Sequence, residues 1–326
     1  MTRRAKIKLS IVVPVYRSER ILSELVAEIS RSVQSLGLNG NFELLLVNDG
    51  SPDGSWQVIC ELAELYEFLQ GISLRRNFGQ HSATMAGLHY ARGSTVIIMD
   101  DDLQHPPEEI GKLLAAIESG FDVCYVRYQD RQHALWKRVG SRFNDLVATW
   151  LLGKPRGLYL SSFKALRREI AQEVIKYDGP YAYLDGLILD VTRSIGTVDI
   201  VHRARRDGKG NYNLKRSISL WLRMATNFSV FPLRLATLLG LGLSALSFVL
   251  IVVVAVQRMR HPDWPVGWAS LLAAVLLVGG VQTFCIGLLG EYLGRAYLRL
   301  NGKPQFVVGA VTPHHATADG PDLVGK

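Results

Sequence analysis

Residues 95–104 read Thr-Val-Ile-Ile-Met-Asp-Asp-Asp-Leu-Gln, a run of β-branched and apolar residues that ends in three successive carboxylates. The apolar run predicts a buried strand. Open α/β sheets bind ligands at the carboxyl ends of their strands, so we expect the acids to lie in a binding loop. Alternate residues of an extended segment point the same way, so Asp100 and Asp102 are candidate oxygen ligands for one hard metal ion. A solvated acidic turn is the alternative.

The segments on either side of this stretch alternate between strand and helix patterns. We expect strands at residues 9–15, 42–47, 72–74, 121–127 and 197–202. We expect helices at residues 21–36, 56–66, 81–91, 107–119, 136–152, 167–177 and 183–194. This alternation predicts an α/β fold with a mostly parallel sheet that helices cover.

Composition and charge narrow the class of protein. The net charge of +8 suits nucleic acid, an anionic membrane surface or a phosphorylated substrate. The three cysteines are widely separated, which excludes a disulfide framework and zinc spacing and fits a reducing compartment. The basic residues 1–8 and the apolar residues 9–15 resemble a signal peptide. No small-residue cleavage site follows them, so we interpret residues 9–15 as a cytosolic first strand.

The composition changes abruptly after Arg234. Residues 235–256 and 266–290 carry no charge, and each segment is long enough to span a bilayer. Basic residues flank the pair on both outer sides: Lys215, Arg216, Arg223 and Arg234 before it, and Arg295, Arg299 and Lys303 after it. The positive-inside rule therefore places both ends in the cytoplasm. A buried helical pair of a soluble protein is the alternative. The preceding segment mixes Trp221 and Phe228 with basic residues and predicts an interfacial helix.

Further polar groups follow other predicted strands. Asp49 comes directly after the second strand, within the turn-rich residues 48–54. It is a candidate acceptor for a base or a ribose, or only part of a turn. The sequence has two basic clusters, and the second, flanked by glycines beside the predicted interfacial helix, suits a lipid-borne phosphate, with a solvated basic face as the alternative. The clusters are Arg127, Arg131, Lys137, Arg138 and Arg142, and Arg203, Arg205, Arg206 and Lys209. Among the histidines only His105 neighbours the acids.

Three segments together resemble the signature motifs of glycosyltransferase family 2. They are Ser-Ile-Val-Val-Pro-Val-Tyr at 10–16, Val-Asn-Asp-Gly-Ser at 47–51 and Asp-Asp-Asp-Leu-Gln at 100–104. Asn-Phe-Gly at 77–79 and Gly-Leu-Leu-Gly-Glu-Tyr at 287–292 narrow the resemblance to the polyisoprenyl-phosphate glycosyltransferases. The resemblance covers residues 7–308. It implies a GT-A domain at 1–212, an interfacial helix at 213–232, two transmembrane helices within 233–294, and a cytosolic juxtamembrane segment with a flexible tail at 295–326.

The resemblance also implies roles for particular residues. Pro14, Tyr16 and Glu19 would line a nucleotide pocket with Asp49, Asp100 and Asp101. Asp100, Asp102 and Gln104 match the metal and diphosphate site, for Mg²⁺ or Mn²⁺. Arg127 and Arg138 match the basic phosphate contacts, with Lys137 as an alternative to Arg138. Arg206 matches an arginine near the acceptor phosphate, and we group Arg205 and Lys209 with it. Of the three acids, Asp101 is the one least expected to matter.

Two positions depart from the family pattern. Leu158 stands where members commonly carry an acid, and Asn211 stands where a lysine is common in a later loop. The departures concern the acceptor-side contacts and the sugar pocket and leave the nucleotide and metal motifs intact. A phosphate monoester is largely ionised at neutral pH, so an acceptor of that kind needs little help from a general base.

The implied function is inverting transfer of a sugar from a nucleotide diphosphate sugar, preferably a UDP-sugar, to a polyprenyl phosphate. It would take place at the cytoplasmic face of the inner membrane, in contact with membrane lipids and without nucleic acid, in a homo-oligomer that the resemblance suggests is a tetramer. Two alternatives stay open. One is a catalytically impaired, nucleotide-binding membrane adaptor. The other is a processive polysaccharide synthase, although the Gln-x-x-Arg-Trp motif and the additional spans of such enzymes are missing.

Overall fold

The computed structural model describes residues 7–129, 154–155, 157–180, 182–201, 231–260 and 267–312. The chain divides into two compact units. The first comprises residues 1–149, 153–211 and 302–326, and the second comprises residues 150–152 and 212–301. The predicted helix at 136–152 and most of the predicted interfacial helix lie outside the described residues.

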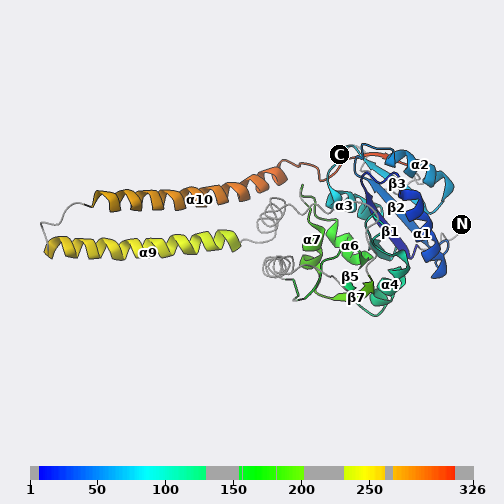
Figure 1. The fold of residues 1–326 in the computed structure, drawn as a ribbon, viewed down its shortest axis with the longest axis horizontal. Helices are drawn as coiled ribbons and strands as arrows, with labels where there is room; N and C mark the ends of the chain where they lie inside the picture. Colours follow the sequence, from blue (N-terminus) through cyan, green and yellow to red (C-terminus); the bar gives the residue numbers. More distant parts are fainter. Residues whose placement is uncertain are drawn as a thin grey trace. The chain divides into compact units, whose positions relative to one another are not determined.

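The first unit is built on an eight-stranded mixed sheet with the order β7-β5-β6-β4-β1-β2-β3-β8 (Figure 1). Its strands are β1 (Leu9–Val15), β2 (Phe42–Asn48), β3 (Leu69–Leu74), β4 (Thr95–Ile98), β5 (Val123–Gln129), β6 (Lys164–Arg167), β7 (Ile195–Val201) and β8 (Val308–Val311). The central strands β4, β1, β2 and β3 run parallel, as do β5 and β7. Strand β6 is antiparallel to both of its neighbours, and β8 is antiparallel to β3.

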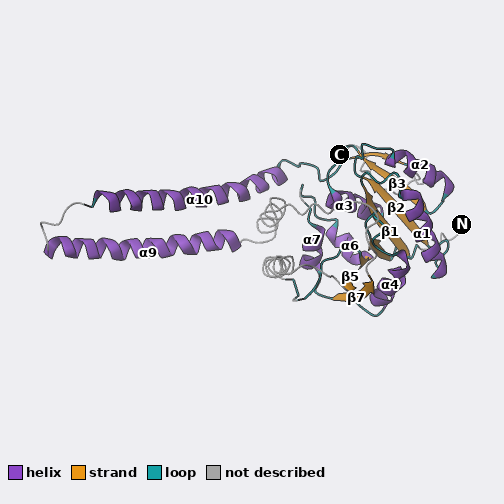
Figure 2. Ribbon diagram, viewed as in Figure 1, coloured by secondary structure: helices purple, strands orange, loops and turns teal. Residues whose placement is uncertain are grey.

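Helices cover both faces of this sheet (Figure 2). The helices are α1 (Leu22–Ser35), α2 (Ser55–Leu65), α3 (Gln80–Tyr90), the short 3₁₀ helix η1 (Pro107–Glu109), α4 (Ile110–Glu118), α6 (Arg168–Val174) and α7 (Leu184–Val191). The apolar stripes of α1, α2 and α4 join one buried cluster with alternate residues of β1 and β2. Helix α3 packs on β1 and β2, where a Cβ added to Gly87 would lie 2.4 Å from Val12 Cγ1. The glycine therefore permits a close approach of helix to strand.

The core confirms the predicted central strands. Every residue of β1 and β2 is buried, as expected for parallel strands with helices on both faces. Strands β6 and β8 were not predicted. Each is four residues long and antiparallel, and neither shows the long apolar run that indicated the central strands.

Strand β8 returns the chain to the sheet after the second unit. It pairs with β3, and the N–H of Arg75 donates to the Val307 carbonyl at 2.9 Å. The Gln305 side chain is buried and donates to the Gly179 carbonyl at 3.1 Å. Residues 295–326 were predicted to form a juxtamembrane segment and a flexible tail. Part of that range instead forms β8, an edge strand of the sheet. Residues 313–326 lie outside the described part.

The second unit contains two long helices that contact each other, α9 (Phe231–Arg260) and α10 (Trp268–Leu300). Many of their large apolar side chains are exposed, among them Leu241, Phe248, Phe284 and Ile286. Within the described residues, Leu277–Leu300 is the one stretch long and apolar enough to cross a membrane, and the apolar stretch Ala236–Leu250 is shorter. The helical pair agrees with the predicted segments, and its crossing of a membrane stays a prediction.

Candidate functional site

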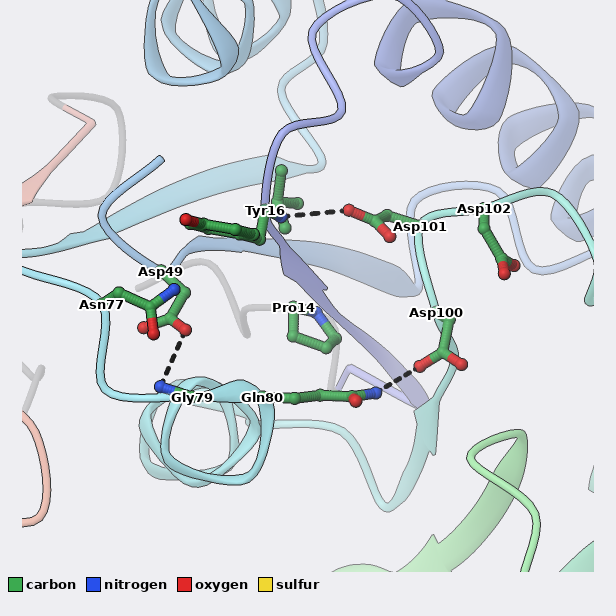
Figure 3. A pocket seen from close by; sticks show the side chains of 10 residues that line it. Pro14, Tyr16, Asp49, Asn77, Gly79, Gln80, Asp100, Asp101 and Asp102 are labelled. Carbon is green, nitrogen blue, oxygen red and sulfur yellow. Dashed lines mark hydrogen bonds between the residues drawn. The ribbon is translucent and has the colours of Figure 1, made fainter. Parts of the chain in front are cut away.

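A pocket of about 320 Å³ opens at the carboxyl ends of β1, β2 and β4 (Figure 3). The segment that joins β3 to α3 completes its wall. The lining residues are Pro14, Val15, Tyr16, Asp49, Asn77, Gly79, Gln80, Asp100, Asp101 and Asp102. Five residues predicted at a nucleotide site, and the predicted metal ligand Asp102, therefore face one cavity, because parallel strands bring their carboxyl ends to the same edge of a sheet.

Asp49 holds the loop between β3 and α3. Its two carboxylate oxygens accept the backbone N–H groups of Phe78 at 2.7 Å and Gly79 at 2.9 Å. Burial raises the pKa of the Asp49 carboxyl, and the two backbone donors oppose that rise. The turn beside it is tight, because Gly50 has a φ of 59° and a Cβ there would lie 2.4 Å from the Arg76 carbonyl carbon. Asp49 therefore shapes the pocket wall as well as lining it.

Asp101 ties the ends of β1 and β4 together. Its carboxylate accepts the N–H of Tyr16 at 3.1 Å and the hydroxyl of Ser18. Figure 3 shows this carboxylate turned toward Tyr16. Burial is the main cause that raises the pKa of Asp101 to about 6. The acid that the sequence ranked last among the three therefore binds residues at the end of β1.

Asp100 is held by side chains from two distant segments. The amide of Gln80 donates to its Oδ1 at 2.5 Å, and the hydroxyl of Ser162 donates to its Oδ2 at 2.6 Å. The backbone N–H of Asp100 donates to Nδ1 of His105 at 2.9 Å. The sequence singled out His105 by its position beside the acids, whereas no sequence signal identified Gln80 or Ser162.

Asp102 continues the acidic loop into a turn. Its Oδ1 accepts the N–H of Gln104 at 3.1 Å, and Leu103 has a φ of 57°, an uncommon value for a branched residue. Gln104 itself is not among the residues that line the pocket. In the part of the chain that the structure describes, no group of three or more His, Cys, Asp or Glu side chains is arranged around a metal position.

Comparison with known proteins places the chain in a family. Residues 10–176 match the model of glycosyl transferase family 2, and residues 231–296 match that of the GtrB C-terminal hairpin. The chain belongs to glycosyltransferase family 2. It is 34% identical over 314 residues to the undecaprenyl-phosphate 4-deoxy-4-formamido-L-arabinose transferase of Salmonella paratyphi B, and the alignment covers 95% of each chain. The transferase of the same name from Salmonella heidelberg is 34% identical over 307 residues, with 93% of each chain covered.

A solved structure is similar at a lower level. The glucosyl-3-phosphoglycerate synthase of Mycobacterium tuberculosis, in complex with uridine diphosphate, shares 22% identity and a TM-score of 0.47, and the match covers 67% of this chain and 80% of that one. The predicted resemblance, the GT-A type α/β fold with a C-terminal helical pair, and the assignment as a glycosyltransferase enzyme are confirmed.

The structure brings some predicted family 2 residues to the pocket and leaves others away from it. Glu19 accepts the N–H of Gly54 at 3.0 Å and so fixes the loop before α2 instead of lining the pocket. Arg127 lies in β5, where its guanidinium makes two hydrogen bonds to Asp199 at 2.5 and 2.8 Å, and it does not line the pocket. The other predicted phosphate contacts lie outside the described residues: Arg138, Arg205, Arg206 and Lys209.

One departure from the family 2 pattern can be located. Leu158, which stands where members commonly carry an acid, is buried, and its carbonyl accepts a hydrogen bond from the Lys154 ammonium. The position therefore serves packing here. Asn211, the second departure, lies outside the described residues.

Proposed function

We propose that this chain transfers a sugar from a nucleotide diphosphate sugar to a polyprenyl phosphate. The observation that carries the proposal is full-length similarity to transferases named for undecaprenyl phosphate, together with a pocket at the strand ends of a family 2 domain. The pocket is walled by Tyr16, Asn77 and the acidic loop, groups that suit a base, a ribose and a diphosphate. A UDP-sugar is our preferred donor.

The acidic loop suits a divalent cation, Mg²⁺ or Mn²⁺. Asp100, Asp101 and Asp102 all line the pocket, and the Asp101 carboxylate accepts hydrogen bonds from Tyr16 and Ser18. Mg²⁺ is commonly held by one or two carboxylates together with substrate phosphates and water, so a cluster of three protein acids is not required. Such an ion would neutralise charge that develops on the leaving diphosphate. We assign Asp100 and Asp102 to the ion, with Gln104 supporting Asp102 through its backbone.

The other proposed site residues position the acceptor and neutralise phosphate charge. An acceptor phosphate is ionised at neutral pH and can attack the anomeric carbon in line, inverting it, without an acid at position 158. We propose that Arg127 and Arg138 contact phosphate, and that Arg205, Arg206 and Lys209 receive the acceptor phosphate. Arg127 would have to leave its pair with Asp199, which water weakens because both side chains are partly exposed.

We further propose that α9 and α10 anchor the protein in the inner membrane with the sugar-transfer domain on the cytoplasmic side, in a homo-oligomer. Supporting observations are the match to a C-terminal hairpin model, the exposed apolar side chains of both helices and the basic residues that flank them. A membrane anchor keeps the domain where a long-chain lipid presents its phosphate.

Purified protein incubated with radiolabelled nucleotide sugars and polyprenyl phosphate tests the proposal. We expect a lipid product that carries one sugar, formed only when Mg²⁺ or Mn²⁺ is present. A polymeric product would indicate a processive synthase instead. No product with any donor, together with retained nucleotide binding, would indicate a non-catalytic adaptor.

A further inference from the structure

The Asp100 carboxylate is restrained at both of its oxygens. Gln80, the first residue of α3, holds Oδ1, and Ser162, in the segment before β6, holds Oδ2. Both contacts are hydrogen bonds to a carboxylate, and such bonds are stronger than those between neutral groups. Rotation of the carboxylate would break at least one of these bonds. Its orientation toward the pocket is therefore set by residues far away in the sequence.

His105 stands behind Ser162 and orients its hydroxyl. Nδ1 of His105 accepts the Asp100 N–H, so the neutral imidazole carries its proton on Nε2. That nitrogen lies 3.4 Å from Ser162 Oγ and 3.7 Å from Asp100 Oδ2. The ring is buried and stacks on Phe163, with centroids 5.2 Å apart and an interplanar angle of 12°. Because the Nε2–H of His105 faces Ser162 Oγ, the hydroxyl cannot donate to that nitrogen. Its single proton therefore points to Asp100 Oδ2.

We propose that Ser162 is a positioning residue for the metal and diphosphate end of the site. Its hydroxyl, oriented by His105, keeps the Asp100 carboxylate turned to the pocket, ready to coordinate the cation that accompanies the nucleotide. Ser162 does not line the pocket and therefore acts through Asp100. This inference rests on the proposed metal-dependent function. Loss of a residue that orients a metal ligand typically costs 10- to 100-fold in metal affinity or activity.

The test measures Mn²⁺ binding to the full-length protein in saturating UDP, by the electron paramagnetic resonance signal of free Mn²⁺. We expect Ser162→Ala to weaken Mn²⁺ binding about tenfold. Ser162→Thr keeps the hydroxyl and should retain most of the affinity. Ser161→Ala is the matched control, because the Ser161 hydroxyl accepts the N–H of Phe163 at 3.1 Å and, within the described residues, makes no hydrogen bond to Asp100. In the transfer assay, Ser162→Ala should need more Mn²⁺ for half-maximal rate and should recover rate at saturating Mn²⁺.

Four results would overturn the inference. Equal Mn²⁺ affinity in wild type and Ser162→Ala would show that the hydroxyl does not position Asp100. Equal losses in Ser161→Ala and Ser162→Ala, or no recovery in Ser162→Thr, would show a general disturbance of the loop. Wild-type protein that binds no Mn²⁺ in the presence of UDP would overturn the proposed metal-dependent function itself, and the role of Ser162 with it.

Discussion

Thr312 Oγ1 accepts a hydrogen bond from the backbone N–H of Gly71 at 3.1 Å, although 241 residues separate the two along the chain. The N–H of Thr312 donates in return to the Gly71 carbonyl at 3.0 Å. Gly71 has no room for a side chain, because a Cβ there would lie 2.4 Å from Ile59 Cγ2. The chain that follows α10 is therefore fixed to Gly71 in β3, the strand whose carboxyl end leads into the pocket loop.

Replacing this threonine tests the contact. Thr312→Val preserves the shape of the side chain and leaves the buried Gly71 N–H without its acceptor, so the free energy of unfolding should fall by about 1–3 kcal/mol. Denaturant unfolding of the full-length protein measures the change. Thr312→Ser keeps the hydroxyl and should stay close to wild type. A larger loss in Thr312→Ser than in Thr312→Val would show that methyl packing, and not the hydrogen bond, fixes the segment.

The two acids assigned to the cation should be essential for transfer. Asp100→Ala or Asp102→Ala removes a proposed ligand of the cation, and we expect sugar transfer to fall by about 100-fold or more while the protein still folds. Initial rates with labelled donor measure the loss, and circular dichroism checks the fold. Glu118→Ala, at the exposed end of α4, is the control acid and should leave the rate unchanged. Normal turnover in either aspartate variant would refute the metal assignment.

Asp49 should control the order of the pocket loop. Asp49→Ala removes the acceptor of the Phe78 and Gly79 N–H groups, which should cost about 1–3 kcal/mol for each group left unpaired. Hydrogen exchange at residues 75–80 should become faster, and UDP should bind more weakly. Unchanged exchange there would contradict the role of Asp49 in holding the loop. Faster exchange without weaker UDP binding would show that the order of this loop does not contribute to nucleotide binding.

His89 should make stability depend on pH. Burial lowers the pKa of His89 below its ordinary value of 6.5, and its ring packs against Phe306 with centroids 5.6 Å apart. The unfolded chain then binds the proton at a higher pH than the native protein does. The contribution of His89 to the free energy of unfolding is fully present above pH 6.5. It falls as the pH drops through 6.5 toward the lowered pKa of the native protein.

The variant His89→Phe keeps an aromatic ring and cannot titrate. Between pH 7.5 and 5.5, wild-type protein should therefore lose more unfolding free energy than His89→Phe does. Denaturant unfolding at several pH values measures both slopes. Parallel slopes would show that His89 is as readily protonated in the native protein as in the unfolded chain.

The central strands and the acidic loop were predictable because their signals are local. Apolar runs such as that of β1, and polar residues such as Asp49 directly after a strand, identify the sheet edge that carries the pocket. Gln80 and Ser162 were not predictable, since their relation to Asp100 depends on how α3 and the segment before β6 pack. The family pattern assigned Glu19 to the nucleotide pocket. In the structure its carboxylate accepts the backbone N–H of Gly54.

Strand β8 also sets an order of assembly. It is the last described strand along the chain, and both long helices precede it. During synthesis the sheet therefore keeps β3 as an open edge until α9 and α10 have been made, and an open edge invites pairing with other chains. Closure of that edge comes only after both long helices have been synthesised. A sheet that includes β8 can therefore form only after both helices of the pair have been synthesised.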